Sequence, residues 1–252
     1  MLELCGVSAG YGKKEVLHEV SVCFAPGKLT AVIGPNGSGK STLLKTALGI
    51  LSAARGEIRL NGANLSALDR AAIARQIAYL AQGKAIPDMT VEQMVLHGRF
   101  PHLRYPRRYS DRDREIAADA IRHMGLQDVA HMPLAALSGG MRQTAYIAMA
   151  LVQQTEYILL DEPTTYLDIA HQIDLMRMLR DLTGQGKGVV AVMHDLPLTL
   201  NFSDSLVVVG DGQVMLCGTP EEVFASGILE RCFGVSLERT AEGNYCYRYG
   251  HM

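Results

Sequence analysis

A glycine-rich loop that ends in a lysine and a serine, set between two apolar runs, constrains this chain more than any other segment. Its residues are Gly34, Pro35, Asn36, Gly37, Ser38, Gly39, Lys40 and Ser41, which fit the pattern GxxxxGK[ST]. The run Leu29–Ile33 predicts a strand before the loop, and Thr42 begins an apolar helical segment after it. Glycines let backbone N–H groups converge on phosphate oxygens, and a helix N-terminus adds the positive end of a dipole. The loop and Thr42 therefore predict a nucleotide phosphate site, in which Lys40 reaches the β- and γ-phosphates and Ser41 binds Mg²⁺.

Two adjacent carboxylates, Asp161 and Glu162, follow a second apolar run, Tyr157–Leu160. Like charges at this spacing repel each other and favour protonation of one of them, so the pair is costly unless a cation and a reacting water use it. We expect Asp161 to join the Mg²⁺ shell and Glu162 to act as general base toward the attacking water. The alternative for Glu162 is a structural one, in which it caps the turn formed with Pro163.

The spacing of apolar residues predicts an α/β fold. A strand-rich start gives way to helical spacing between Met89 and about Gln154, and the chain then alternates apolar strands such as Val189–Met193 with helices. Short apolar strands that alternate with helices indicate a parallel sheet covered on both sides. One helix between these strands is expected to present a single apolar face, formed by Ile169, Ile173, Met176, Leu179 and Leu182.

Composition excludes several other classes of protein. The 252 residues carry a formal net charge of -2, which disfavours nucleic acid and other polyanions as partners. Hydrophobic residues make up 48% and charged residues 20%, so neither disorder nor a coiled coil is indicated. The five cysteines are scattered without a CxxC pair, so no disulfide framework or zinc site is expected. No segment approaches the roughly 20 apolar residues that span a bilayer.

The segment Leu137–Gln143 reads Leu-Ser-Gly-Gly-Met-Arg-Gln, and no Asn-Lys-x-Asp motif of a GTPase is present. Together with the loop and the acidic pair, it resembles the ATP-binding subunits of ABC transporters, whose signature reads LSGGQ. The resemblance runs from about Leu2 to Phe224. Ser138 stands at a helix N-cap position, and Gly139 and Gly140 expose backbone N–H groups, which is also the pattern of an ordinary capped turn. Met141 replaces the usual glutamine.

The resemblance assigns further roles one residue at a time. Tyr11 matches the aromatic residue that stacks on adenine, although a lone loop tyrosine is equally often a filler. Gln82 matches the glutamine that senses the γ-phosphate and Mg²⁺. Asp168 matches an aspartate that communicates between the two copies of a dimer, and it equally fits the N-cap of the next helix. His194 matches the switch histidine at the γ-phosphate, where a structural histidine is the alternative.

The resemblance also implies an organisation and partners. A P-loop NTPase of the ABC type has a RecA-like core, an antiparallel β subdomain and an inserted helical subdomain. We expect one cassette over 1–252, with the core at 1–86 and 155–252 and the helical subdomain, which carries the signature, at 87–154. The implied partners are a second copy, paired head to tail around two ATP molecules, an integral membrane permease and, indirectly, an extracytoplasmic binding protein. The expected location is peripheral, on the cytoplasmic face of the inner membrane.

Two further stretches narrow the cargo. Gly98–His102 and Pro163–Leu175 resemble the corresponding stretches in ATP-binding subunits of importers of iron-siderophore complexes, haem and cobalamin, and a ferric siderophore is the favoured cargo.

The stretch from Arg99 to Arg114 contains six arginines and two acidic residues, so its net charge is +4. It is either a solvated loop or a surface that docks a helix of the permease. A soluble ABC ATPase that does not transport is the competing class, but such proteins usually have tandem cassettes or a coiled-coil insertion.

The C-terminal tail, Gly227–Met252, contains no motif that indicates a function. Tyr245, Tyr247 and Tyr249 alternate with polar residues, as in a terminal strand, and we assign them no function.

Overall fold

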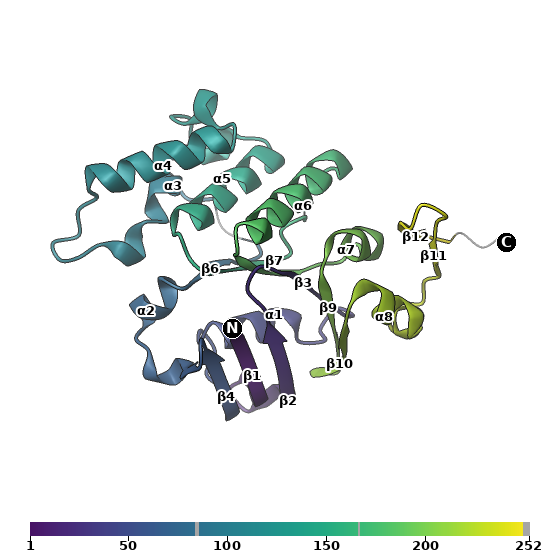
Figure 1. Ribbon diagram of the computed structural model, residues 1–252. Coiled ribbons are helices and arrows are strands. Elements are labelled where there is room, and N and C mark those ends of the chain that lie inside the picture. The colour runs from purple at the N-terminus through teal and green to yellow at the C-terminus, as the bar shows by residue number, and fades with distance from the viewer. Residues whose placement is uncertain (84–85, 166, 249–252) are drawn as a thin grey trace.

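The computed structural model describes residues 1–83, 86–165 and 167–248. Within these ranges the chain forms two larger sheets and one short hairpin, and helices cover the central sheet on both faces (Figure 1). Among the described helices, none combines the length and the apolar character that a membrane span requires. Tyr166 and Tyr249, which belong to segments considered above, lie outside the described residues.

The central sheet has six strands in the order β10-β9-β3-β8-β7-β6. Their bounds are Gln213–Gly218, Ser205–Gly210, Leu29–Ile33, Gly188–Val192, Tyr157–Asp161 and Ile77–Leu80. The five strands from β9 to β6 run parallel, and β10 pairs antiparallel at the edge. Strands β3, β7 and β8 are fully buried, as their continuous apolar sequences predicted, because helices or the second sheet pack on both faces.

A second, antiparallel sheet has the order β2-β1-β4-β5. Its strands are Lys14–Phe24, Leu2–Tyr11, Arg55–Leu60 and Ala63–Asn64. Apolar side chains of β1 and β2 pack with α1 (Lys40–Ala47) against one face of the central sheet, contributed by residues such as Leu159 and Val190. Alternate residues of the same strands, such as Ile158 and Val189, point into a second core on the opposite face.

The second core is covered by helices that lie above the central sheet in Figure 1. The helices after α1 are α2 (Arg70–Ala74), α3 (Val91–His97), α4 (Asp111–His123), α5 (Gly139–Val152), α6 (Ile169–Gly184), α7 (Leu196–Phe202), α8 (Pro220–Ala225) and α9 (Ile228–Phe233). Short 3-10 turns include η2 (Phe100–His102), and β11 (Leu237–Arg239) pairs with β12 (Tyr245–Tyr247) as the terminal hairpin. The α/β fold class predicted from the sequence is thus confirmed.

The helices α3, α4 and α5 pack against one another and fall within the predicted helical subdomain. A Cβ atom on Gly98 would lie 2.1 Å from the backbone oxygen of Met149, so glycine is needed where α3 meets α5. The cap of α4 is a capping box, in which Ser110 and Asp113 bond each other's backbone N–H groups. The subdomain limits 87 and 154 themselves stay a prediction.

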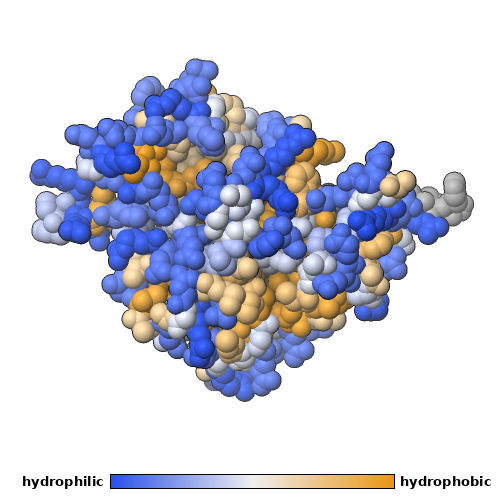
Figure 2. All heavy atoms as spheres, viewed as in Figure 1, coloured by the Kyte–Doolittle hydropathy of each residue, from blue (hydrophilic) through white to orange (hydrophobic). Residues whose placement is uncertain are grey.

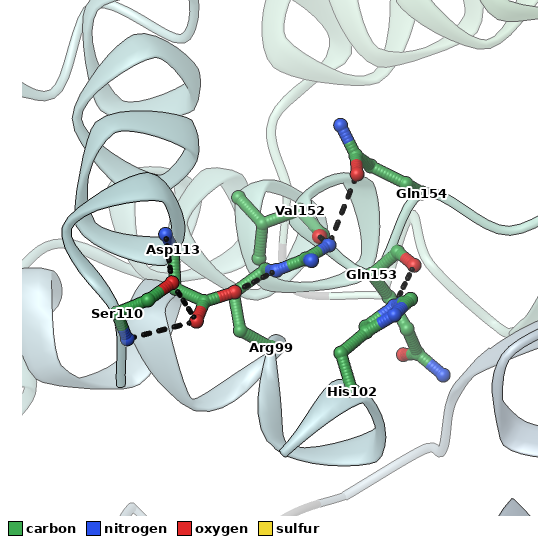
Figure 3. Close-up of polar contacts among 7 residues, drawn as sticks. All are labelled: Arg99, His102, Ser110, Asp113, Val152, Gln153 and Gln154. Atoms are coloured by element: carbon green, nitrogen blue, oxygen red, sulfur yellow. Dashed lines mark hydrogen bonds and ion pairs between the residues drawn. The ribbon is translucent and has the colours of Figure 1, made fainter. Parts of the chain in front are cut away.

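Arg99 corrects one expectation about the basic stretch. Its side chain is buried, and its Nε donates to Asp113 Oδ1 at 2.9 Å while Nη1 donates to the Val152 oxygen at 2.8 Å (Figure 3). It therefore belongs to the interior and not to a surface loop. His102 and Gln153 lie beside this network, where His102 Nε2 is 2.8 Å from the Gln153 oxygen. The arginine network thus ties α3, α4 and the end of α5 together.

Ile169 corrects a second expectation. It was predicted to lie on the apolar face of α6, but it is 76% exposed, while Met176, Leu179 and Leu182 of that helix are buried as predicted. Ile169 is the first residue of α6, directly after the N-cap residue Asp168. A helix begins where the chain enters from the surface, so the 3.6-residue period overestimates burial at its first turn.

Candidate functional site

The glycine-rich loop joins β3 to α1, as its sequence predicted. Two of its positions, 34 and 39, require glycine. A Cβ atom on Gly34 would lie 2.0 Å from the Val209 oxygen, and Gly39, the N-cap of α1, has a φ of 105°. Both conditions exclude side chains. Lys40 is the first residue of α1, so the loop delivers its lysine at the positive end of the helix dipole.

The Lys40 ammonium lies inside the loop. Its Nζ donates to the backbone oxygens of Gly34, at 2.8 Å, and Pro35, at 2.9 Å. Burial lowers the pKa of Lys40, and the nearby carboxylates of Glu162 and Asp161 oppose that shift. The hydroxyl of Ser38 is buried and has no hydrogen-bond partner among the described residues. A cation, a helix start and a free hydroxyl within one loop fit a phosphate group.

Asp161 ends the buried strand β7 and meets the loop from the other side. Its Oδ1 accepts a hydrogen bond from the Ser41 hydroxyl at 2.9 Å, and its Oδ2 accepts one from the Tyr79 hydroxyl at 3.4 Å. Burial raises the pKa of Asp161, and Glu162 adds to the increase. Burial also raises the pKa of the Tyr79 phenol, with the Asp161 charge as a second cause. A neighbouring cation would offset the cost of this buried carboxylate.

The paired oxygens of Ser41 and Asp161 fit the requirements of Mg²⁺. The described residues contain no group of three or more His, Cys, Asp or Glu side chains arranged to hold a metal. Mg²⁺ is usually bound through one or two carboxylates together with substrate phosphates, so one carboxylate and a hydroxyl beside a phosphate loop suffice. Gln82, the third expected ligand, makes its described hydrogen bond to Glu162 and not to either of these oxygens.

Glu162 is held by side chains from three separate segments. Its Oε1 lies 2.7 Å from Nε2 of His194, and its Oε2 accepts hydrogen bonds from Gln82 Nε2 and, at 3.3 Å, from Thr165 Oγ1. Its side chain is 16% exposed, against 43% for His194. Its φ is 53°, a left-handed conformation that is costly for a residue with a side chain. Gln82 follows β6 and His194 follows β8, so the three residues meet at the carboxyl edge of neighbouring parallel strands.

Ser138 of the signature and Asp168 form helix caps elsewhere in the chain. Ser138 Oγ accepts from the Met141 N–H at 3.3 Å, and Asp168 Oδ1 accepts from the His171 N–H at 2.9 Å. Their capping roles are therefore present, as the structural alternatives expected. Among the described residues, no hydrogen bond or ion pair joins Ser138, Gly139, Gly140 or Asp168 to the loop at 34–41. Tyr11 is half-exposed at the end of β1.

Two members of the site, Tyr79 and Thr165, were not predicted from the sequence. Tyr79 lies on β6, three residues before Gln82 in the sequence. Its position beside Asp161 depends on the pairing of β6 with β7. Thr165 lies three residues after Glu162, so its short spacing could have suggested a contact. The whole site combines an anion-binding loop, an oxygen pair for a cation and a carboxylate that can accept a proton. On a parallel sheet flanked by an antiparallel one, these features define a nucleoside triphosphatase of the P-loop class.

Comparison with known proteins narrows that class. The family model described as ABC transporter matches residues 17–165, and the chain belongs to the ABC transporter family. An iron(3+)-hydroxamate import ATP-binding protein of Bacillus subtilis is 41% identical over 91% of this chain and 86% of its own length. A ferric enterobactin transport ATP-binding protein of Escherichia coli is 39% identical over 91% of this chain and 85% of its own length. This chain is thus an ATP-binding, ATP-hydrolysing member of its family.

A solved structure supports the same fold. The dimeric structure of an ATP-binding cassette bound to ADP and phosphate, in a post-hydrolysis state, has a TM-score of 0.75 to this chain. It is 25% identical, and the alignment covers 87% of this chain and 99% of that one.

Proposed function

We propose that this chain hydrolyses ATP to power the import of a ferric siderophore through a membrane permease. The observation that carries the proposal is the convergence of Gln82, His194 and Thr165 on the Glu162 carboxylate beside the phosphate loop. The cargo is proposed from the relatives named above, which are ATP-binding proteins for ferric hydroxamate and ferric enterobactin. Haem and cobalamin remain the alternatives that the sequence left open.

In the proposed reaction, the oxygen of a water molecule attacks the γ-phosphorus while the bond to the β,γ-bridging oxygen breaks. Glu162 accepts the proton of the water, and the paired His194 orients the carboxylate. Lys40 and the backbone N–H groups of the loop offset negative charge on the transferred phosphoryl group. The products are ADP and inorganic phosphate. The half-exposed Tyr11 ring is the proposed stacking surface for adenine.

We propose that Ser41 and Asp161 hold Mg²⁺, with Gln82 as a further contact. A Mg²⁺ ion held by these residues would supply positive charge that offsets the negative charge of the phosphates. Ser41 and Asp161 already share a hydrogen bond of 2.9 Å, so the two oxygens are positioned together by the fold.

The signature residues are proposed to complete the site of a second copy. Ser138, Gly139 and Gly140 begin α5, and their helix start is a second anion-binding device within one chain. This device makes no bond to the chain's own phosphate loop among the described residues. A head-to-tail dimer would bring each signature to the partner's γ-phosphate, and Asp168 would lie at the same interface.

Replacing Lys40 with Ala is expected to weaken ATP binding about 10- to 100-fold. Two charge-assisted hydrogen bonds to phosphate oxygens would be lost, and the loop would lose its only buried cation among the described residues. Isothermal titration of ATP into the purified chain measures the change. Lys28→Ala is the matched control and should keep the ATP affinity, since Lys28 is an exposed lysine that pairs with Asp204. Unchanged affinity of Lys40→Ala would remove the lysine from the phosphate site.

A groove of about 370 Å³ offers a place for a helix of the permease. Its lining includes Leu48, Ile50, Ile73 and Tyr79, and Ile50 is largely exposed. An amphipathic helix laid in an apolar groove is a common mode of recognition. The ring of Tyr79 lines this groove while its hydroxyl reaches Asp161, so an occupant would lie one side chain away from the proposed Mg²⁺ site.

The basic loop between η2 and α4 lies near this groove. Arg75, the C-cap of α2, donates to the Pro101 oxygen of η2 at 3.4 Å. This bond joins α2, whose Ile73 lines the groove, to the start of the loop. The loop projects from the left of the molecule in Figure 1, where Figure 2 shows mainly hydrophilic residues. Arg107 stacks on the Phe100 ring at 4.6 Å, and Tyr105 is 97% exposed. We propose that this loop contacts the permease beside the groove.

Changing both Arg107 and Arg108 to Glu is expected to lower the amount of cassette that co-purifies with its permease by at least about tenfold. Reversing two charges at an interface replaces attraction with repulsion, which costs several kcal/mol in such contacts. The matched control changes Arg55 and Arg59 of β4 to Glu, which alters the net charge equally on another surface. Equal recovery of both double variants would exclude the loop from the interface.

The cargo is tested in proteoliposomes that contain the cassette, its permease and its binding protein. ATP hydrolysis is measured with ferric hydroxamate, ferric catecholate, haem and cobalamin, each loaded on the binding protein. Stimulation by a ferric siderophore alone supports the proposal. Stimulation by haem or cobalamin alone would replace the proposed cargo, and hydrolysis independent of any permease would favour the non-transport class.

A further inference from the structure

His171, in the first turn of α6, links two helix starts that the proposed function assigns to the dimer interface. Its Nδ1 lies 2.8 Å from Asp168 Oδ1, and its backbone N–H donates to the same oxygen at 2.9 Å. The carboxylate is therefore held twice by one residue. These bonds, the backbone one first, lower the pKa of Asp168 and favour its charged form.

The same imidazole packs on the signature. A Cβ atom on Gly140 would lie 3.1 Å from Cδ2 of His171 and 3.4 Å from its Cγ and Nε2. The ring therefore fills the space that a side chain at position 140 would need. Gly140 belongs to the first turn of α5, which Ser138 caps. One side chain thus connects the Asp168 carboxylate to the start of the signature helix.

This bridge contributes little to the core of the fold. The side chains of His171 and Asp168 are both more than half exposed. Within the described ranges, the ring of His171 has Asp168 as its hydrogen-bond partner and no other. An exposed contact of this kind adds little to the stability of the fold.

We infer that His171 is a positioning residue that presents Asp168 and the Ser138–Gly140 segment to a second copy of this chain as one rigid surface. The inference rests on the proposed ATP-bound dimer. Without the bridge, each of the two segments would have to be ordered separately when the dimer closes. That extra ordering weakens association without affecting ATP binding by the single chain.

The test uses the Glu162→Gln chain, in which a bound ATP should persist. The dissociation constant of the dimer is measured by sedimentation at saturating ATP and Mg²⁺. Adding His171→Ala is expected to raise this constant about 3- to 10-fold, the range for one lost hydrogen bond with its packing. The ATP affinity of the dilute, monomeric chain should stay within about twofold.

Two variants separate the halves of the bridge. His171→Asn keeps an N–H donor at the δ position for Asp168 but removes the ring atoms that cover Gly140. His171→Phe keeps a ring over Gly140 but removes the donor. Each should restore part of the association lost in His171→Ala. His131→Ala is the matched control, since His131 is an exposed histidine that pairs with Glu92 through Nδ1 on another surface.

An unchanged dimer constant for His171→Ala would overturn the inference, as would a loss of monomer melting temperature that follows the same order across the variants. Failure of the parental Glu162→Gln chain to dimerise with ATP would instead overturn the proposed dimer, and this inference with it. A selective rise in the dimer constant, partly reversed by Asn and Phe, is the result that the bridge predicts.

Discussion

Glu162→Gln is expected to lower kcat for ATP hydrolysis about 10²- to 10⁴-fold, the usual contribution of a general base. The amide keeps the size of the side chain and its capacity to accept a hydrogen bond from Gln82, but it cannot take a proton from water. ATP binding should persist, because Lys40 and the phosphate loop are unchanged. Phosphate release under saturating ATP measures kcat, and titration with ATP measures binding.

Two further measurements sharpen this result. Glu115→Gln, an exposed glutamate of α4 that pairs with Arg112, is the control and should keep wild-type turnover. His194→Ala should also lower turnover, but by less than Glu162→Gln, since His194 acts through the carboxylate at 2.7 Å. Near-normal hydrolysis by Glu162→Gln would show that another group accepts the proton.

Asp113→Asn is expected to destabilise the fold by about 3–5 kcal/mol, the effect of removing one partner of a buried ion pair. Arg99 and Asp113 are both buried, and Arg99 would keep its charge without a counterion. The free energy of unfolding in urea, with the unfolding slope checked for two-state behaviour, measures the loss. Asp119→Asn breaks the exposed pair with Arg122 and should cost less than about 1 kcal/mol.

The same pair predicts a dependence on pH. Burial alone would raise the pKa of Asp113, but hydrogen bonds from Ser110 and Arg99 outweigh it and lower the pKa to about 2. A folded pKa below the ordinary 3.8 means that the unfolded chain binds more protons in this range, so stability falls as the pH drops from about 4 toward 2. Asp113→Asn should remove this part of the acid loss, since the amide does not titrate there. An identical slope in both proteins would contradict the assignment.

Much of the fold and several local sites followed from the sequence because their physical basis is local. The apolar runs at Leu29–Ile33 and Tyr157–Leu160 form buried strands, and the caps at Ser138 and Asp168 form as their residue types indicate. Strand β8 ends at Val192, one residue before its predicted end. The errors at Arg99 and Ile169 have one origin, since periodicity and charge counts describe a segment but not what packs against it.

The sequence by itself determined the conformation of the glycine-rich loop at 34–41, because this conformation depends on consecutive backbone groups and on glycines whose conformation is a local property. Only the tertiary structure decided that Gln82, Glu162 and His194 meet at one place. They follow β6, β7 and β8, three neighbouring strands of a sheet whose order differs from the order in the chain. It also decided that Tyr79 reaches Asp161 and that His171 covers Gly140. Such contacts join residues that are distant in the chain, and packing selects them.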